Sequence, residues 1–116
     1  MSSTTAYGVV ARCSATLAWD AIEQAVADFA RTVFPRAAIA IGEDVDHGSL
    51  VSRRPEPFSF VNVTEGGRSF AFCRFRRFAE GIEFVFNLTE SGQSSAQIDR
   101  CLAAALPLAV VRRELF

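Results

Sequence analysis

Residues 42–48 form a polar stretch that contains the single histidine of the chain, His47, close to Glu43, Asp44 and Asp46. Imidazole and carboxylate groups are the ligands that zinc and other divalent cations take from proteins. However, their spacing matches neither the calcium loop of an EF-hand nor the HExxH motif of zinc proteases. A histidine beside acids in a polar loop is usually solvated, so we expect neither a metal site nor catalytic residues here. The role of this loop stays open.

The other residue types exclude several kinds of catalytic chemistry. All twelve basic residues are arginine, so a Schiff-base lysine and the lysine of a phosphate-binding P-loop are absent. Cys13, Cys73 and Cys101 are far apart, and their spacing matches no zinc, redox or haem motif. The chain also contains no GxSxG motif and no glycine-rich phosphate loop. The sequence therefore predicts no catalytic residue and no cofactor, and it favours a non-enzymatic protein without deciding the question.

Net charge and hydropathy bear on partners and location. A net charge of −1 gives no basic field for nucleic acid, although Arg74, Arg76 and Arg77 alternate with phenylalanines as in a base-stacking strand. The N-terminal residues lack the basic and apolar regions of a signal peptide. The apolar run 102–111 is too short to span a bilayer. Widely spaced cysteines are typical of reduced thiols, so we expect a cytoplasmic protein that binds neither nucleic acid nor membrane.

The stretch 58–88 predicts the centre of the fold. It contains three segments rich in phenylalanine and valine, separated by Gly66-Gly67 and by Glu80-Gly81. Two glycines accept the positive φ angles of a type I′ turn, so the first pair predicts a tight hairpin. We therefore expect three antiparallel strands, at 58–63, 70–78 and 82–88.

The flanking segments predict two helices. Apolar residues recur at helical spacing over 17–34, and Trp19 belongs to the stripe that faces the core. Ser94 and Gln97 form a capping box, which predicts the start of a C-terminal helix. A proline divides this helix, and we expect its second piece over 108–115.

Short apolar runs predict the remaining strands. Further strands are expected at 7–13, 37–42 and 50–53, and the proline-rich run 54–57 is expected to be an extended connector. The sequence thus predicts a single α+β domain over 1–116. Its antiparallel sheet would have four to six strands, with the N-terminal and C-terminal helices packed on one face.

Turn geometry decides which side chains share a face of the sheet, because side chains alternate along a strand. A two-residue turn at Gly66-Gly67 pairs Phe60 with Cys73, and one at Glu80-Gly81 sets Phe75 opposite Phe86. The predicted core face then carries Phe58, Phe60, Cys73, Phe75, Phe84, Phe86 and Leu88. The opposite face carries Val61, Val63, Phe70 and Phe72 at one end, and Arg74, Arg76, Glu83, Val85 and Asn87 at the other.

The apolar end of this second face suggests a function. A monomer seldom exposes a large apolar patch, so the patch predicts a protein interface, and C2 pairing is the commonest way to bury it. We therefore expect a homodimer or a complex with another protein. The predicted interface residues are Val61, Val63, Phe70, Phe72, Arg74, Arg76 and Val85.

The sequence supports two functions. The first is a small non-enzymatic interaction module, adaptor-like, chaperone-like or regulatory, that binds through the partly apolar sheet face. The second is a small-ligand-binding protein or small enzyme, with an aromatic pocket for an apolar ligand between the sheet and the C-terminal helix. The first function loses its basis if the N-terminal strand or the proline-rich connector folds over the second face.

Overall fold

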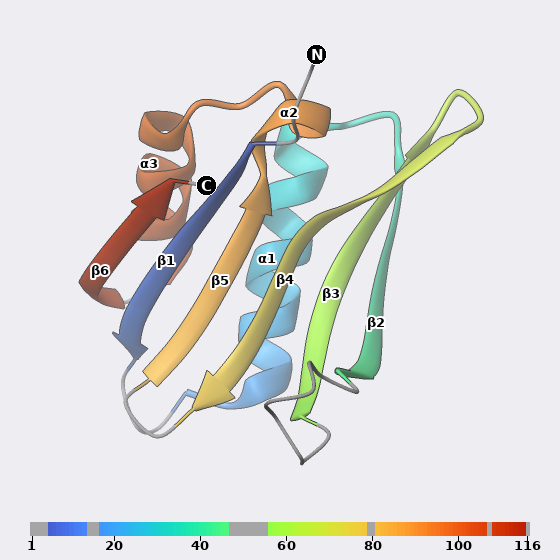
Figure 1. Cartoon of the computed structure of the whole chain (residues 1–116). Helices are drawn as coiled ribbons and strands as arrows, with labels where there is room; N and C mark the ends of the chain where they lie inside the picture. The colour runs from blue at the N-terminus through green and yellow to red at the C-terminus, as the bar shows by residue number, and fades with distance from the viewer. Residues whose placement is uncertain (1–4, 14–16, 47–55, 79–80, 107, 116) are drawn as a thin grey trace.

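The order of elements along the chain is strand, helix, four strands, two helices and a last strand (Figure 1). This computed structural model describes residues 5–13, 17–46, 56–78, 81–106 and 108–115. The elements are β1 (Ala6–Cys13), α1 (Trp19–Val33), β2 (Ala38–Asp46), β3 (Glu56–Glu65), β4 (Arg68–Phe78), β5 (Gly81–Asn87), α2 (Leu88–Ser91), α3 (Ser95–Ala105) and β6 (Leu108–Leu115).

The strands of the described residues form one six-stranded sheet in the order β2-β3-β4-β5-β1-β6. Every neighbouring pair is antiparallel. Helix α1 crosses behind the sheet in Figure 1, and α3 packs against α1. The predicted α+β class with an antiparallel sheet is therefore confirmed.

Helix α1 buries one apolar stripe against the sheet. Ile22, Val26 and Phe29 recur at helical spacing and are buried, and the helix contacts β2 and β3. Alanines between them are also buried and let the helix backbone approach the strands closely. The helix ends at Val33, two residues before Pro35, which cannot continue a helical hydrogen-bond ladder.

The turn between β3 and β4 has the predicted geometry. Gly66 and Gly67 have φ angles of 59° and 79°, and Glu65 pairs with Arg68 across the turn. Positive φ at both central positions matches a type I′ turn, whose twist suits the flanking strands. The prediction of a hairpin at this position is confirmed.

A β-bulge interrupts this hairpin a few residues from the turn. Val63 pairs with Phe70 as predicted, but Val61 pairs with Cys73 instead of Phe72. The extra residue, Phe72, shifts the register by one, and a one-residue shift moves the following side chains to the other face.

The bulge makes the predicted partition of faces wrong. On one side of it Phe70 and Phe72 face α1, because their rings lie near Phe34 and Phe29. On the other side the shifted register keeps Cys73 and Phe75 inside, where they are also buried. Strand β3 therefore buries Ser59, Val61 and Val63 and turns Phe58 and Phe60 outward, the reverse of the prediction.

The β4–β5 pairing also differs from the prediction, without changing the faces. Phe75 lies opposite Phe84 and Cys73 opposite Phe86, two residues away from the predicted register. A shift of two residues keeps every side chain on its face. The prediction that Phe75, Phe84 and Phe86 belong to the core is confirmed by their burial.

The predicted capping box begins α3. The Ser94 Oγ accepts a hydrogen bond from the Gln97 N–H, and the Gln97 side chain accepts one from the Ser94 N–H. Ile98 and Leu102 are buried in the same core as α1. The short helix α2, which the sequence did not suggest, is capped by Asn87, whose side chain accepts a hydrogen bond from the Glu90 N–H.

The prediction of a second helical piece over 108–115 is wrong, because these residues form β6. The strand pairs along β1, from Tyr7 opposite Leu115 to Cys13 opposite Leu108. Two β-branched residues, Val110 and Val111, favour an extended chain, and the open edge of β1 supplies hydrogen-bond partners.

Strand β2 is longer than predicted, because Gly42–Asp46, expected as a loop, continues to pair with β3 as far as Glu56. Pro57, expected in a connector, lies inside β3. The strand predicted at 50–53 lies outside the described residues. Within the described part of the chain, no helix is long and apolar enough to cross a membrane.

Candidate interaction surface

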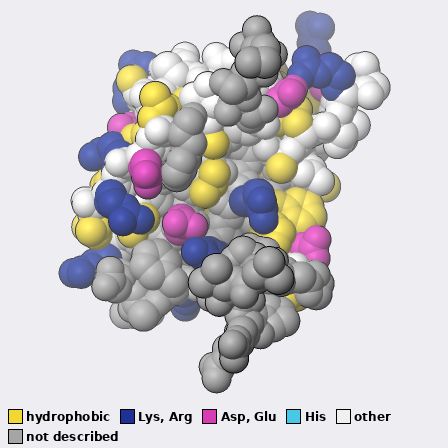
Figure 2. Space-filling model, viewed as in Figure 1, with side chains coloured by type: hydrophobic (Ala, Val, Ile, Leu, Met, Phe, Trp, Pro, Cys, Tyr) yellow, Lys and Arg dark blue, Asp and Glu magenta, His cyan; other side chains and the backbone are white. Residues whose placement is uncertain are grey.

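The face of the sheet opposite α1 is called the outer face here, and it is turned toward the viewer in Figures 1 and 2. A row of paired positions crosses it, from Phe60 through Arg74 and Val85 to Gly8 and Glu114. Figure 2 shows apolar side chains on this face among arginines and carboxylates. No helix of the described residues covers this face in Figure 1.

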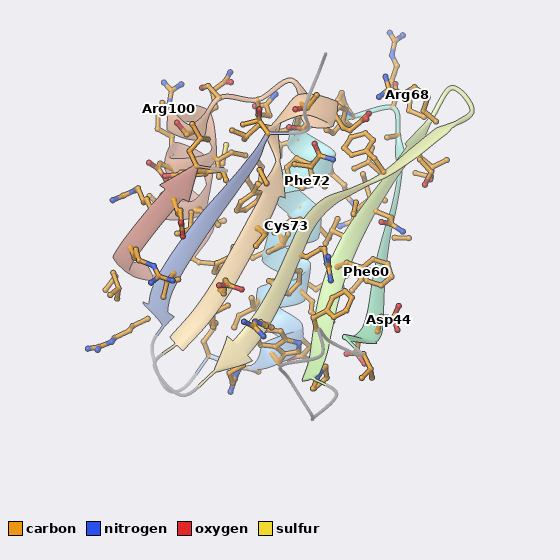
Figure 3. All side chains as sticks on the ribbon, viewed as in Figure 1. Asp44, Phe60, Arg68, Phe72, Cys73 and Arg100 are labelled. Atoms are coloured by element: carbon orange, nitrogen blue, oxygen red, sulfur yellow. The ribbon has the colours of Figure 1, made fainter. Side chains whose placement is uncertain are left out.

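Two phenylalanines dominate one end of the outer face. The rings of Phe58 and Phe60 lie 6.2 Å apart, and both side chains are half-buried. The Arg74 guanidinium lies 4.3 Å from the centre of the Phe58 ring, a cation–π contact. The Phe60 ring lies over Gly42 (Figure 3), since a Cβ atom built on that glycine would be 2.3 Å from the ring. The absence of a side chain at Gly42 thus lets the Phe60 ring pack directly on the backbone of β2.

The other end of the outer face is charged. The Arg76 Nε donates a 3.2 Å hydrogen bond to the Glu83 Oε1, and the two residues are directly paired across β4 and β5. A small hollow of about 20 Å³ lies next to them, lined by Gly8, Val10, Glu83, Val85, Arg112 and Glu114. Its size suits no ligand larger than one water molecule.

The structure separates the predicted interface residues into two groups. Arg74, Arg76 and Val85 lie on the outer face, as predicted. The other four, Val61, Val63, Phe70 and Phe72, lie on the core side, and Val61, Val63 and Phe72 have no exposed surface. The prediction that these four form an exposed patch is wrong, because the bulge reverses the face on which they lie.

The apolar side chains that β3 does present on the outer face are instead Phe58 and Phe60. Both were expected in the core. Both faces of the stretch 58–63 carry two apolar side chains, so the alternating pattern alone does not tell which face is inside. The sequence carries no local signal that favours one face, because phenylalanines and valines both pack on the core side of the sheet.

A pocket of about 330 Å³ opens where the start of α1 meets the ends of β2, β3 and β4. It is lined by Trp19, Glu43, Pro57, Phe58, Ser59 and Arg77. The Arg77 guanidinium lies 5.1 Å from the Trp19 ring centre, and the Phe75 ring lies 5.4 Å from the same indole. Trp19 was predicted to face the core, and it is half-buried there between these neighbours.

A chain of hydrogen bonds runs behind this pocket. The Trp19 Nε1–H donates to the Ser59 Oγ (2.9 Å), which donates to the Glu23 Oε2 (3.0 Å). Ser59 is only 2 % exposed, and its oxygen already accepts the indole proton. A nucleophilic serine needs an accessible oxygen and an orienting base. The Ser59 oxygen is buried, so this serine serves instead to connect α1 and β3 by hydrogen bonds.

A second, more open pocket of about 340 Å³ lies between α1 and α3. Its lining is mostly small: Ala25, Asp28, Phe29, Thr32, Cys101, Ala104 and Ala105. Only one aromatic residue contributes, so this space differs from the aromatic pocket predicted between sheet and C-terminal helix. The core phenylalanines of the sheet, Phe75, Phe84 and Phe86, are buried against neighbouring rings.

Two titratable groups among the described residues have shifted pKa values, and both lie inside the fold. Burial raises the pKa of the Cys73 thiol well above its ordinary value. Burial and the hydrogen bond to Asp99 raise the pKa of Tyr7 to about 12. The Tyr7 hydroxyl donates to the Asp99 Oδ1 at 2.8 Å, and the Arg113 Nε donates to the Asp99 Oδ2 at 3.1 Å. This trio ties β1, α3 and β6 together, a structural task.

Among the described residues, no three histidine, cysteine or acidic side chains lie together as metal ligands. Glu43 and Asp44 belong to β2 and are exposed, while His47 lies outside the described residues. The expectation of no metal site stays a prediction. Comparison of the chain with protein-family models, with curated proteins and with solved structures finds no match.

Proposed function

We propose that this protein is a non-enzymatic interaction module, a small cytoplasmic adaptor or regulator, whose outer face binds another protein. The single observation that carries the proposal is the position of Phe58 and Phe60 on the side of the sheet away from α1. Aromatic residues with a neighbouring arginine are the side chains enriched at protein interfaces.

The chemistry of this face suggests what the partner presents. Phe58, Phe60 and Val85 supply apolar area, and Arg74 is an exposed cation beside them. A partner with an apolar side chain flanked by carboxylates would bury the rings and pair with the guanidinium.

A matched pair of arginine variants tests the proposal. Arg74→Ser removes an exposed cation from the outer face, and Arg31→Ser removes one from α1 on the opposite side. Partners would be captured by cross-linking in the native host, using wild type, the two variants and Val85→Ser. Circular dichroism would confirm that each variant is folded.

The expected result is one partner that wild type and Arg31→Ser retain and that both outer-face variants lose. A partner retained by all four proteins, or lost equally with Arg31→Ser, contradicts binding through the outer face.

A second candidate function is binding of a small ligand in the pocket at Trp19. The observation in its favour is that the indole ring and the Arg77 guanidinium line the same 330 Å³ space. An aromatic carboxylate would stack on the indole and pair with the guanidinium. Trp19 is the only tryptophan in the chain, so its fluorescence reports binding directly. Titration with a panel of aromatic carboxylates that leaves this fluorescence unchanged rejects the second candidate.

A further inference from the structure

Strand β6 forms one edge of the sheet and exposes apolar side chains there. The exposed fractions are 36 % for Val110, 55 % for Val111 and 63 % for Leu115. These are three of the four large apolar residues that are exposed in the described part of the chain, the other being Val45. Edge strands in monomers are usually shielded by charged side chains, proline or a covering segment; β6 contains no proline, and its charged residues are Arg112, Arg113 and Glu114.

The backbone of β6 presents hydrogen-bonding groups outward. The Thr5 carbonyl accepts a hydrogen bond from the N–H of Leu88, the residue after β5. The backbone N–H and C=O groups of Thr5 therefore point toward β5. Directions alternate along an antiparallel strand, so Gly8 points to β6, where its partner is Glu114. The neighbours of that glutamate, Arg113 and Leu115, therefore direct their N–H and C=O groups to the open edge.

These outward groups allow an antiparallel pairing of β6 with a second copy of itself. A two-fold axis at Arg113 places Arg113 opposite its counterpart in a hydrogen-bonded pair. The same register sets Arg112 opposite Glu114 on both sides of the axis, in the part of β6 between Leu115 and the β-bulge at Val111. Each arginine at 112 then meets a carboxylate of the second copy, and the exposed Leu115 of each copy lies at the end of the paired segment, next to the bulge at Val111 of the other. Of the registers that these outward groups allow, this one sets the charges at 112 and 114 opposite charges of the other sign.

We infer that the protein forms a homodimer by antiparallel pairing of β6 with β6, in the register that sets Arg112 opposite Glu114. The charge of the central Arg113 is compensated within each copy, because its Nε donates to the Asp99 Oδ2. The two sheets join into one continuous sheet of both copies. This inference concerns a different surface from the outer face and does not depend on the partner proposed for it.

Charge reversal tests the register. Arg112→Glu places glutamates at both 112 and 114, and Glu114→Arg places arginines at both positions, so each variant alone faces like charges in its own dimer. We expect each to weaken the dimer about tenfold or more. An equimolar mixture of the two variants restores opposite charges at both pairs and should form a heterodimer as strong as the wild-type dimer. Sedimentation over a dilution series measures all four samples.

Amide hydrogen exchange supplies a second, residue-specific measurement. In the dimer, the N–H groups of Arg113 and Leu115 are hydrogen-bonded across the edge, so their exchange slows as the protein concentration rises. Exchange at Glu114, whose N–H faces β1, should not change with concentration.

Three results overturn the inference. They are a wild-type protein that stays monomeric throughout the dilution series, a dimer that both charge reversals leave unchanged, and a mixture of the variants that fails to associate.

Discussion

Replacement of Phe72 by alanine tests the bulge on which the outer face depends. Phe72 has no exposed surface, and its ring lies 5.1 Å from Phe29, 5.7 Å from Phe86 and 6.1 Å from Phe34. If the hairpin paired without the bulge, this ring would point away from α1 and its loss would matter little. In the bulged structure, its loss opens a cavity at the centre of an aromatic cluster.

The expected cost follows from this burial. Removing a fully buried phenylalanine ring destabilises a protein by about 3–5 kcal/mol, because the cavity collapses only in part. The whole free energy of unfolding of a domain is about 5–15 kcal/mol, so Phe72→Ala should leave a marginally stable protein. Phe58→Ala is the matched control, since that ring is half-buried and contacts Arg74 and Phe60. Its cost should be about 0.5–1.5 kcal/mol.

Urea denaturation, followed through the fluorescence of Trp19, measures both variants. The Phe72→Ala midpoint should fall by on the order of 2 M, given the slope typical of small domains. The Phe58→Ala midpoint should move much less. Equal losses, or a larger loss for Phe58→Ala, would falsify the assignment of faces and return the apolar patch to Val61, Val63 and Phe72.

Three further predictions concern local features. Replacing both Gly66 and Gly67 by alanine should cost about 1–3 kcal/mol of stability through the positive φ angles alone, since the added Cβ atoms meet open space; an unchanged urea midpoint contradicts the turn type. Tyr7, the only tyrosine, should ionise near its pKa of about 12 in ultraviolet titration. Because the unfolded chain releases this proton near its ordinary pKa of about 10, stability should fall as pH rises from about 10 to about 12, and Tyr7→Phe should remove that contribution. A thiol reagent should modify Cys101 while Cys73, fully buried and with a raised pKa, stays unmodified in the native state by mass spectrometry; modification of both at one rate contradicts the burial.

Features set by a few neighbouring residues were predictable from the sequence. The turn at Gly66-Gly67 follows from the backbone freedom of glycine, and the start of α3 follows from hydrogen bonds between Ser94 and Gln97. The stripe that α1 buries follows from the spacing of its apolar residues. Each of these depends on contacts within one turn or one helix face, so the sequence carries the whole signal.

Features set by distant pairing were not predictable in the same way. The spacing of apolar residues over 108–115 fits a helix, yet the free edge of β1 makes the extended form better hydrogen-bonded. The bulge at Phe72 is likewise decided by packing, because it lets Phe72 and Cys73 both lie on the core side. No local pattern separates this hairpin from one with regular pairing, and a single extra residue was enough to misplace four of the seven predicted interface residues.

The two proposed surfaces are related through the sheet that carries both. The row from Phe60 through Arg74 and Val85 to Gly8 ends at Glu114 of β6. Pairing of β6 with β6 would therefore extend the outer face of one copy directly into that of the second. A partner could then bind one long sheet face instead of two short ones, which raises its affinity if it reaches both. Such a gain has a measurable consequence, because the Arg112→Glu variant would bind the partner more weakly although the partner-binding residues are intact. A partner bound equally by the dimer and by this variant would show that each outer face acts alone.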